Sequence, residues 1–243
     1  MARPASTTTP ASYDDMEDAA CLRRYEALQA EQPDLFVNPP NCPTQILLDD
    51  REIARAKEGA RANRAAQGMP THDLRVGLLA DDVYIGHVVR DAVRFSDGNY
   101  GLYNRIVASG GITVLPILGD AIVLIRIFRH APRRWFLEAP QGFLPQGADP
   151  ADVTKDELME EIGATVTELT ALGTIYTSTA MTSEYLHMFA ASIAGTGAPQ
   201  TAEGIEAIRV IPAREIDALL SDGTICDGPT TALITHARLR GLL

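Results

Sequence analysis

Apolar positions in the N-terminal part of the chain recur with helical spacing. Residues 16–31 place four side chains on one face of a predicted helix: Cys21, Leu22, Tyr25 and Leu28. A second helix is predicted for residues 51–66, with Asp50 as its N-cap and an end near Gly68 and Pro70. These helices predict an N-terminal helical extension, residues 16–75.

Short β-branched runs replace the helical pattern from residue 76 onward. Gly, Asp, Asn and Pro separate these runs, and this pattern is typical of strands joined by turns. Gly119 and Asp120 separate two such runs and predict a hairpin turn. The predicted strands lie within residues 81–95, 110–118, 120–130, 133–142, 167–178, 184–193 and 206–212.

Helical patterns return late in the chain. Asp149, Pro150 and Gly163 bracket a helix over residues 150–162, and two further helices are expected in residues 213–222 and 228–243. This order predicts an α+β fold, a mixed α/β sandwich, for a domain of residues 76–243. Residues 1–15 are rich in Pro, Ser and Thr and predict a disordered tail.

Composition narrows the classes of partner. The formal net charge is −11, which argues against a basic nucleic-acid interface. Three widely spaced cysteines suggest neither a disulfide framework nor a metal site. The sequence shows no signal peptide and no apolar run long enough to cross a membrane. We therefore expect a cytoplasmic protein that interacts with neither nucleic acid nor membrane.

The helix over residues 150–162 carries an unusual concentration of negative charge. Glu157, Glu160 and Glu161 lie at helical positions i, i+3 and i+4, so all three project from one face, where like charges repel. A solvated acidic face is the plain interpretation. The alternative is a site for Mg²⁺, because hard divalent cations prefer carboxylate and phosphate oxygens.

The residues from Gly142 onward resemble the signature of the Nudix hydrolase family, G-x5-E-x7-R-E-U-x-E-E-x-G-U, where U is a bulky aliphatic residue. The residues in register are Gly142, Glu157, Leu158, Glu160, Glu161 and Gly163. Ala148 replaces the first Glu, Asp156 replaces the Arg, and Ala164 is small for the final aliphatic position. Residues 85–240 are similar to the ADP-ribose pyrophosphatase branch, which implies an α/β/α Nudix sandwich, usually a homodimer.

The resemblance also implies roles for individual residues. Glu157, Glu160 and Glu161 match metal-binding and catalytic carboxylates, and the main-chain carbonyl of Gln141 matches a further metal ligand. Glu184 matches a loop acid that binds metal or activates water. The residues that match substrate-binding positions are Arg129 and Glu138.

The implied reaction is hydrolysis of a diphosphate in ADP-ribose, an ADP-sugar or a related nucleoside diphosphate derivative. Mg²⁺, with Mn²⁺ as the alternative ion, neutralises the diphosphate, and water attacks one phosphorus. Because of Ala148 and Asp156, a second hypothesis is a weakly active Nudix protein that binds a nucleotide or a protein partner. A third is an acidic α/β domain with a solvated helix.

Overall fold

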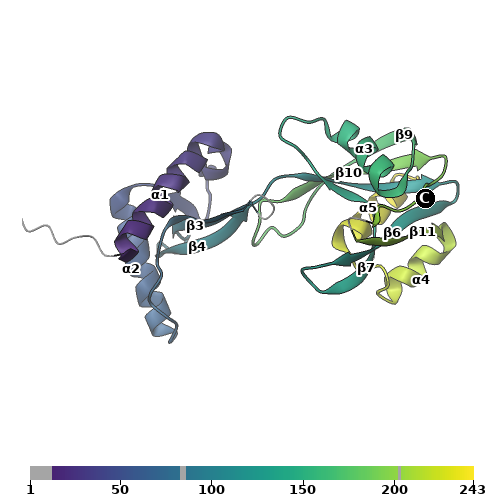
Figure 1. Cartoon of the computed structure of the whole chain (residues 1–243). Coiled ribbons are helices and arrows are strands. Elements are labelled where there is room, and N and C mark those ends of the chain that lie inside the picture. The colour runs from purple at the N-terminus through teal and green to yellow at the C-terminus, as the bar shows by residue number, and fades with distance from the viewer. Residues whose placement is uncertain (1–12, 83–85, 202–203) are drawn as a thin grey trace, which may run out of the picture. The chain divides into compact units, whose positions relative to one another are not determined.

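The computed structural model describes residues 13–82, 86–201 and 204–243. Within them the chain forms two compact units (Figure 1). The N-terminal unit ends at Ala108 and also includes Ala180–Thr182, and the C-terminal unit comprises Ser109–Thr179 and Ser183–Leu243. The predicted boundary at residues 75/76 is therefore displaced to 108/109, because the strands in between pair within the N-terminal unit.

The N-terminal unit combines two helices with a four-stranded sheet, so it is not only helical. Strand β3 is central: β4 pairs along one edge, and β1 and β2 share the other edge. The elements are α1 (Tyr13–Glu31), β1 (Gln45–Leu47), α2 (Asp50–Ala66), β2 (Gly77–Asp82), β3 (Gly86–Arg94) and β4 (Tyr100–Val107).

Helix α1 buries the apolar face that its sequence predicts. Cys21, Tyr25 and Leu28 are buried, and the Tyr25 hydroxyl donates to the Asp91 carboxylate. The predicted disordered tail of residues 1–15 lies mostly outside the described residues, and α1 already includes residues 13–15.

Helix α2 is capped one residue earlier than predicted. The Asp49 carboxylate accepts from the backbone N–H groups of Arg51 and Glu52, and Asp50 is already helical. Both residues are aspartates, so the sequence offered two N-caps, and the backbone conformation selects the first.

The C-terminal unit is built on a seven-stranded mixed sheet. Its main path is β11-β6-β5-β10-β9, in which β5 and β10 are parallel. The predicted hairpin joins β5 to β6 at Gly119 and Asp120, and the two strands pair only beside this turn. The strands are β5 (Gly111–Leu118), β6 (Ala121–Arg129), β7 (Arg134–Glu138), β8 (Gln141–Phe143), β9 (Val166–Tyr176), β10 (Tyr185–Ile193) and β11 (Ile205–Pro212).

Helices cover both faces of this sheet, which gives the α/β/α sandwich predicted from the sequence (Figure 1). Helix α3 (Pro150–Ile162) closes one apolar core with Leu158 and Ile162. Helices α4 (Ile216–Ser221) and α5 (Gly228–Leu239) close the other. In the described part of the chain, no helix combines the length and the apolar character needed to cross a membrane.

Candidate functional site

Helix α3 begins and ends at the residues that the sequence indicates. The Asp149 carboxylate accepts from the Ala151 N–H at 2.8 Å, and Pro150 occupies the first turn. Gly163 ends the helix in the left-handed region, at φ 61°. These local signals hold α3 in a fixed register, so its glutamates have defined positions against the sheet.

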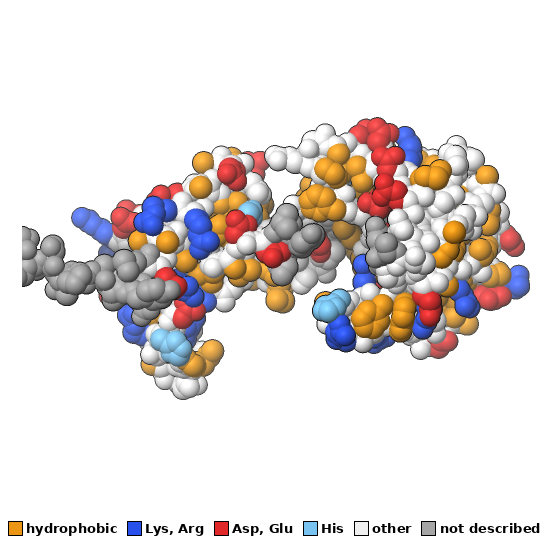
Figure 2. All heavy atoms as spheres, in the orientation of Figure 1, with side chains coloured by type: hydrophobic (Ala, Val, Ile, Leu, Met, Phe, Trp, Pro, Cys, Tyr) orange, Lys and Arg blue, Asp and Glu red, His pale blue; other side chains and the backbone are white. Residues whose placement is uncertain are grey.

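The three glutamates of α3 differ in exposure. Glu161 is only 4% exposed, Glu157 is half-buried, and Glu160 is exposed. Acidic side chains gather on the surface over α3 (Figure 2). A solvated acidic helix would expose all of its carboxylates, so the burial of Glu161 argues for a specific role.

The side chain of Glu157 lies directly against the backbone of β8. A Cβ atom added at Gly142 would lie 2.1 Å from Glu157 Oε1. Only glycine leaves room for the carboxylate there, which gives a physical reason for a glycine fifteen residues before this glutamate. The contact places Glu157 beside the main chain of Gln141 and Gly142.

Strand register places the predicted substrate residues on the face that α3 covers. Ile125 and Ile127 of β6 belong to the α3 core, and Arg129 follows them on the same side of the strand. Glu138 is the cross-strand partner of Ile125, and paired residues share a face. Gly142 is likewise paired with Ile112 of that core.

Arg129 and Glu138 form an ion pair on this face. Glu138 Oε2 accepts from Arg129 Nε at 2.8 Å and from Nη2 at 2.6 Å. Glu138 is 3% exposed, and this burial raises the pKa of its carboxyl, whereas Arg129 opposes the rise and Asp227 adds to it. The structure thus brings two sequence-predicted residues together.

Glu184 directly precedes β10 at the same end of the sheet. Its carboxylate accepts from the Thr177 hydroxyl. Three residues further on, His187 is paired with Ile112, which is itself paired with Gly142. Neighbouring strands lie about 4.8 Å apart, so His187 and Gly142 are separated by about 10 Å.

An aromatic group that the sequence analysis missed lies beside Glu184. Tyr185 contacts Tyr176, with ring centroids 6.2 Å apart, and His187, at 5.4 Å. The Nδ1 atom of His187 is 3.4 Å from the Thr174 hydroxyl. The alternation Tyr185-x-His187 in a predicted strand was the available signal, because alternate residues share a face.

The Gln141 side chain points away from α3, toward the start of α5. Its Nε2 atom donates to Asp227 Oδ2 at 3.4 Å, and the same carboxylate caps α5 through the Thr230 N–H. This contact involves the amide group only and leaves the predicted role of the Gln141 main-chain carbonyl untested.

The donor chemistry beside α3 fits a divalent cation. Glu157 and Glu161 offer carboxylate oxygens, and Glu157 lies against the Gly142 backbone of β8. Among the described residues, however, no three His, Cys, Asp or Glu side chains converge as a metal-binding group. Mg²⁺ commonly uses one or two carboxylates and completes its shell with water and substrate phosphates, so the two observations agree.

Comparison with known proteins identifies the family of the C-terminal unit. The NUDIX domain family matches residues 109–233, which is just over half of the chain and begins where the C-terminal unit begins. The chain therefore belongs to the Nudix family, whose hydrolases generally act with divalent metal ions.

Several pyrophosphatases are similar in sequence. The GDP-mannose pyrophosphatase of Pectobacterium atrosepticum is 33% identical over 178 residues, covering 68% of this chain and 92% of the relative. That of Cronobacter sakazakii is 31% identical, covering 68% and 94%. The ADP-ribose pyrophosphatase of Bacillus subtilis is 27% identical over 47% of this chain, and the chain spans 64% of that relative's length.

A solved structure shares the fold. The crystal structure of an ADP compounds hydrolase superposes with a TM-score of 0.58 at 21% identity, covering 68% of this chain and 91% of the other. Coverage of 68% of the chain, in this structure and in the GDP-mannose relatives, is more than the C-terminal unit contains, so the likeness includes part of the N-terminal unit.

Proposed function

We propose that the protein hydrolyses the diphosphate of a nucleoside diphosphate sugar, either ADP-ribose or an ADP-sugar, or GDP-mannose, and that it uses Mg²⁺ or Mn²⁺. The main support for this proposal is the contact between the Glu157 carboxylate and Gly142, because it brings β8 and α3 together at the family signature. The ADP-ribose and GDP-mannose pyrophosphatases among its relatives support this class of substrate.

The three glutamates of α3 would contact the ion from different positions. Glu157 and Glu161 would hold it from the helix, with the Gln141 main-chain carbonyl on the β8 side. Glu160 is exposed and would act from the rim. When bound, a divalent ion neutralises the diphosphate oxygens and lowers the pKa of water, which the carboxylates alone cannot do.

Glu184 is the candidate general base. Its carboxylate would accept a proton from the attacking water as the water oxygen bonds to phosphorus. The bridging P–O bond breaks, and two phosphomonoesters result, so the reaction needs no covalent intermediate. The Thr177 hydroxyl orients the Glu184 carboxylate for this role.

Arg129 is suited to bind a substrate phosphate while it stays paired. Its Nε and Nη2 atoms contact Glu138, and its side chain is 39% exposed. The described contacts do not use Nη1, which can therefore donate to a phosphate oxygen. Glu138 would then fix the guanidinium plane rather than contact the reacting atoms.

The second candidate function is nucleotide binding without efficient hydrolysis. Asp156, at the position of the family's arginine, is exposed on α3 and cannot pair with the neighbouring glutamates. Tight nucleotide binding without turnover would support it.

A substrate panel with matched variants tests the proposal. ADP-ribose, ADP-glucose and GDP-mannose are incubated with Mg²⁺, and released phosphomonoester is measured. We expect turnover of at least one compound and a loss of at least about a hundredfold in Glu161→Gln. Asp152→Asn, an exposed change on another face of the same helix, should retain activity. Absence of product at high enzyme concentration, or full activity of Glu161→Gln, contradicts the proposal.

We also propose that the protein is a homodimer, as the family resemblance implies. Light scattering coupled to size exclusion should give twice the 26.2 kDa mass of the chain. A mass of 26.2 kDa across the concentration range would contradict a dimer.

A further inference from the structure

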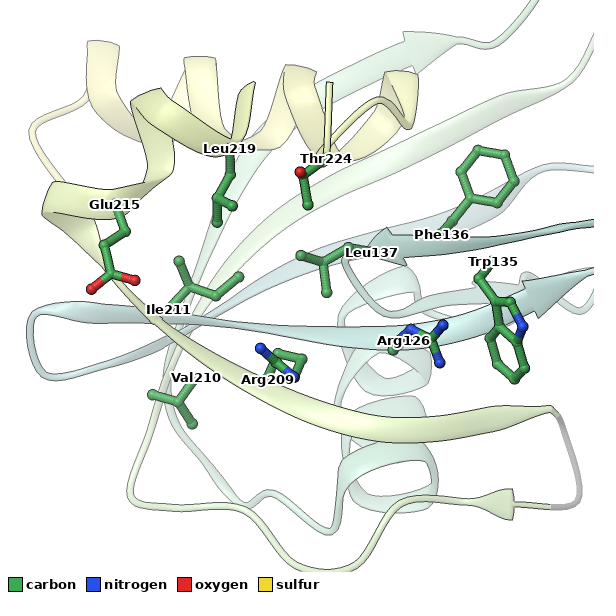
Figure 3. A pocket seen from close by; sticks show the side chains of 10 residues that line it. All are labelled: Arg126, Trp135, Phe136, Leu137, Arg209, Val210, Ile211, Glu215, Leu219 and Thr224. Atoms are coloured by element: carbon green, nitrogen blue, oxygen red, sulfur yellow. The ribbon is translucent and has the colours of Figure 1, made fainter. Parts of the chain in front are cut away.

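A pocket of about 420 Å³ opens on the face of the C-terminal sheet opposite to α3 (Figure 3). It lies between strands β6, β7 and β11 and the short helix α4. Leu137 and Ile211, which line it, belong to the α4–α5 core, whereas the glutamates of the proposed catalytic site lie on the α3 side. The volume is in the range of small-molecule sites.

The floor of the pocket is apolar. Leu137 of β7, Ile211 of β11 and Leu219 of α4 point into it from three separate elements (Figure 3). Beside this floor Trp135 is 41% exposed. An exposed tryptophan next to a concave apolar surface is a favourable stacking partner for a flat ring.

Two arginines line the same pocket in a protein with a formal charge of −11. Arg126 is engaged: it lies 4.4 Å from the Trp135 ring centroid and pairs with Glu206. Arg209 is exposed, and the described residues provide it with no ion-pair or hydrogen-bond partner. Its guanidinium is therefore available to an anion that enters the pocket.

The strand register separates the aromatic and cationic groups. Trp135 is level with Phe128 of β6 and Arg209 with Leu124, so they are four residues apart along β6 and lie on strands at its two edges. Strand spacings place their Cα atoms about 16 Å apart. Glu215 and Thr224 lie on the α4 side and offer a carboxylate and a hydroxyl.

We infer that this pocket binds a nucleoside monophosphate. The base would pack on the part of the Trp135 indole that Arg126 leaves exposed, the phosphate would pair with Arg209, and the sugar hydroxyls would contact Glu215 and Thr224. A nucleotide offers sugar hydroxyls to Glu215 and Thr224 as well as a phosphate to Arg209, which favours it over a simple aromatic acid. The inference concerns binding only and does not depend on catalysis at α3.

The composition of the chain supplies a direct test. Trp135 is the only tryptophan in the sequence, so intrinsic tryptophan fluorescence reports on this pocket. Titration with AMP and with GMP should change the emission saturably, and calorimetry should give matching dissociation constants. Adenosine, which lacks the phosphate, should bind at least about tenfold more weakly.

Matched variants separate this pocket from the catalytic face. Arg209→Ala should weaken AMP binding by about tenfold or more, because it removes the unpaired guanidinium. Arg238→Ala is the control: Arg238 pairs with Asp217, and neither residue lines the pocket. Trp135→Ala, followed by calorimetry, should also weaken binding, and circular dichroism checks that each variant is folded.

Three results would overturn the inference. The first is no fluorescence change and no heat with either AMP or GMP at millimolar concentration. The second is an unchanged affinity in Arg209→Ala, and the third is equal affinity for AMP and adenosine. AMP and GMP are also products of the proposed hydrolysis and can bind beside α3 as well. The Trp135 emission and the Arg209→Ala variant, both on the opposite face of the sheet, therefore separate binding in this pocket from binding at the catalytic site.

Discussion

The contact between Gly142 and Glu157 shows how a glycine can determine the position of a glutamate side chain on another element. The glycine lies on β8 and the glutamate on α3, yet a Cβ atom on the first would collide with the carboxylate of the second. The family signature therefore reflects a steric requirement between two elements and not only a list of ligands.

Gly142→Ala tests this steric requirement. The added Cβ would lie 2.1 Å from Glu157 Oε1, so the carboxylate must move away from β8. We expect at least about a tenfold fall in the hydrolysis rate, because small displacements of positioning groups are costly. Gly195→Ala, where a Cβ meets nothing within 4 Å, is the control. Equal activity of the two variants would show that the Glu157 position is unimportant.

Asp73 gives a prediction for pH. Hydrogen bonding from Arg75 lowers its pKa to about 2, and Arg90 contributes. A carboxyl whose pKa is lower in the folded state stabilises the fold above its unfolded pKa of 3.8 and loses this contribution as the pH falls toward 2. Asp73→Asn should therefore cost about 1 kcal/mol or less at neutral pH, discounted for solvent exposure.

The measurement is urea unfolding, followed by far-UV circular dichroism, between pH 7 and pH 2. The difference between wild type and Asp73→Asn should shrink below about pH 4. Asparagine tolerates the positive φ of 52° at this position, so the substitution changes charge with little backbone strain. A difference that grows as the pH falls would contradict the assignment.

At the scale of elements, the limits of a helix could be predicted where its own segment carries both start and stop signals. The sequence predicted the limits of α3 because an N-cap, a first-turn proline and a C-terminal glycine all lie within its own segment. The boundary between the two units could not be predicted in this way. Strands β2, β3 and β4 read alike to a local analysis, and only their pairing with each other and with β1 assigns them to the N-terminal unit.

Gly163→Ala probes the end of α3. Gly163 has a φ of 61°, and an added Cβ would lie 2.8 Å from the Cα of Gly197. Gly147→Ala is a useful comparison, since Gly147 has a φ of 78° with nothing within 4 Å. Both changes incur left-handed strain of about 1 kcal/mol, and Gly163→Ala should cost about 1 kcal/mol more through the clash. Equal melting temperatures would contradict this reading.

The candidate site could be predicted only in part, because its residues come from elements that are far apart in the sequence. The family pattern indicated Glu157, Glu161, Arg129 and Glu138, but not that the last two pair with each other. The aromatic group around Tyr185 and the pocket at Trp135 draw on residues from strands far apart in sequence. Such groupings depend on sheet order and on which face each strand presents, and neither is encoded locally.

At the scale of the whole molecule, the two units have separate cores and separate reporters. Trp135 lies in the C-terminal unit, whereas the buried network of Tyr25, Asp91 and Arg105 lies in the N-terminal unit. Proteins with more than one compact unit often unfold in more than one step. Fluorescence follows one unit alone, and far-UV circular dichroism follows both.

Tyr25→Phe should therefore affect the two signals differently. It removes a buried hydrogen bond to a charged carboxylate, which costs about 1.5–3 kcal/mol. We expect an earlier circular dichroism transition and an unchanged Trp135 fluorescence midpoint in urea. If the fluorescence midpoint falls by an equal amount, the two units unfold as one.

Strands β6 and β7 serve both faces of the C-terminal sheet at once. Arg129 and Glu138 point to the α3 side, while Arg126 and Leu137 are paired on the opposite side. A single-residue insertion or deletion inside either strand would turn the residues beyond it to the opposite face. The candidate active site and the Trp135 pocket would then both lose binding residues. Length changes during divergence should therefore accumulate in the turn at residues 130–133, where they alter neither side.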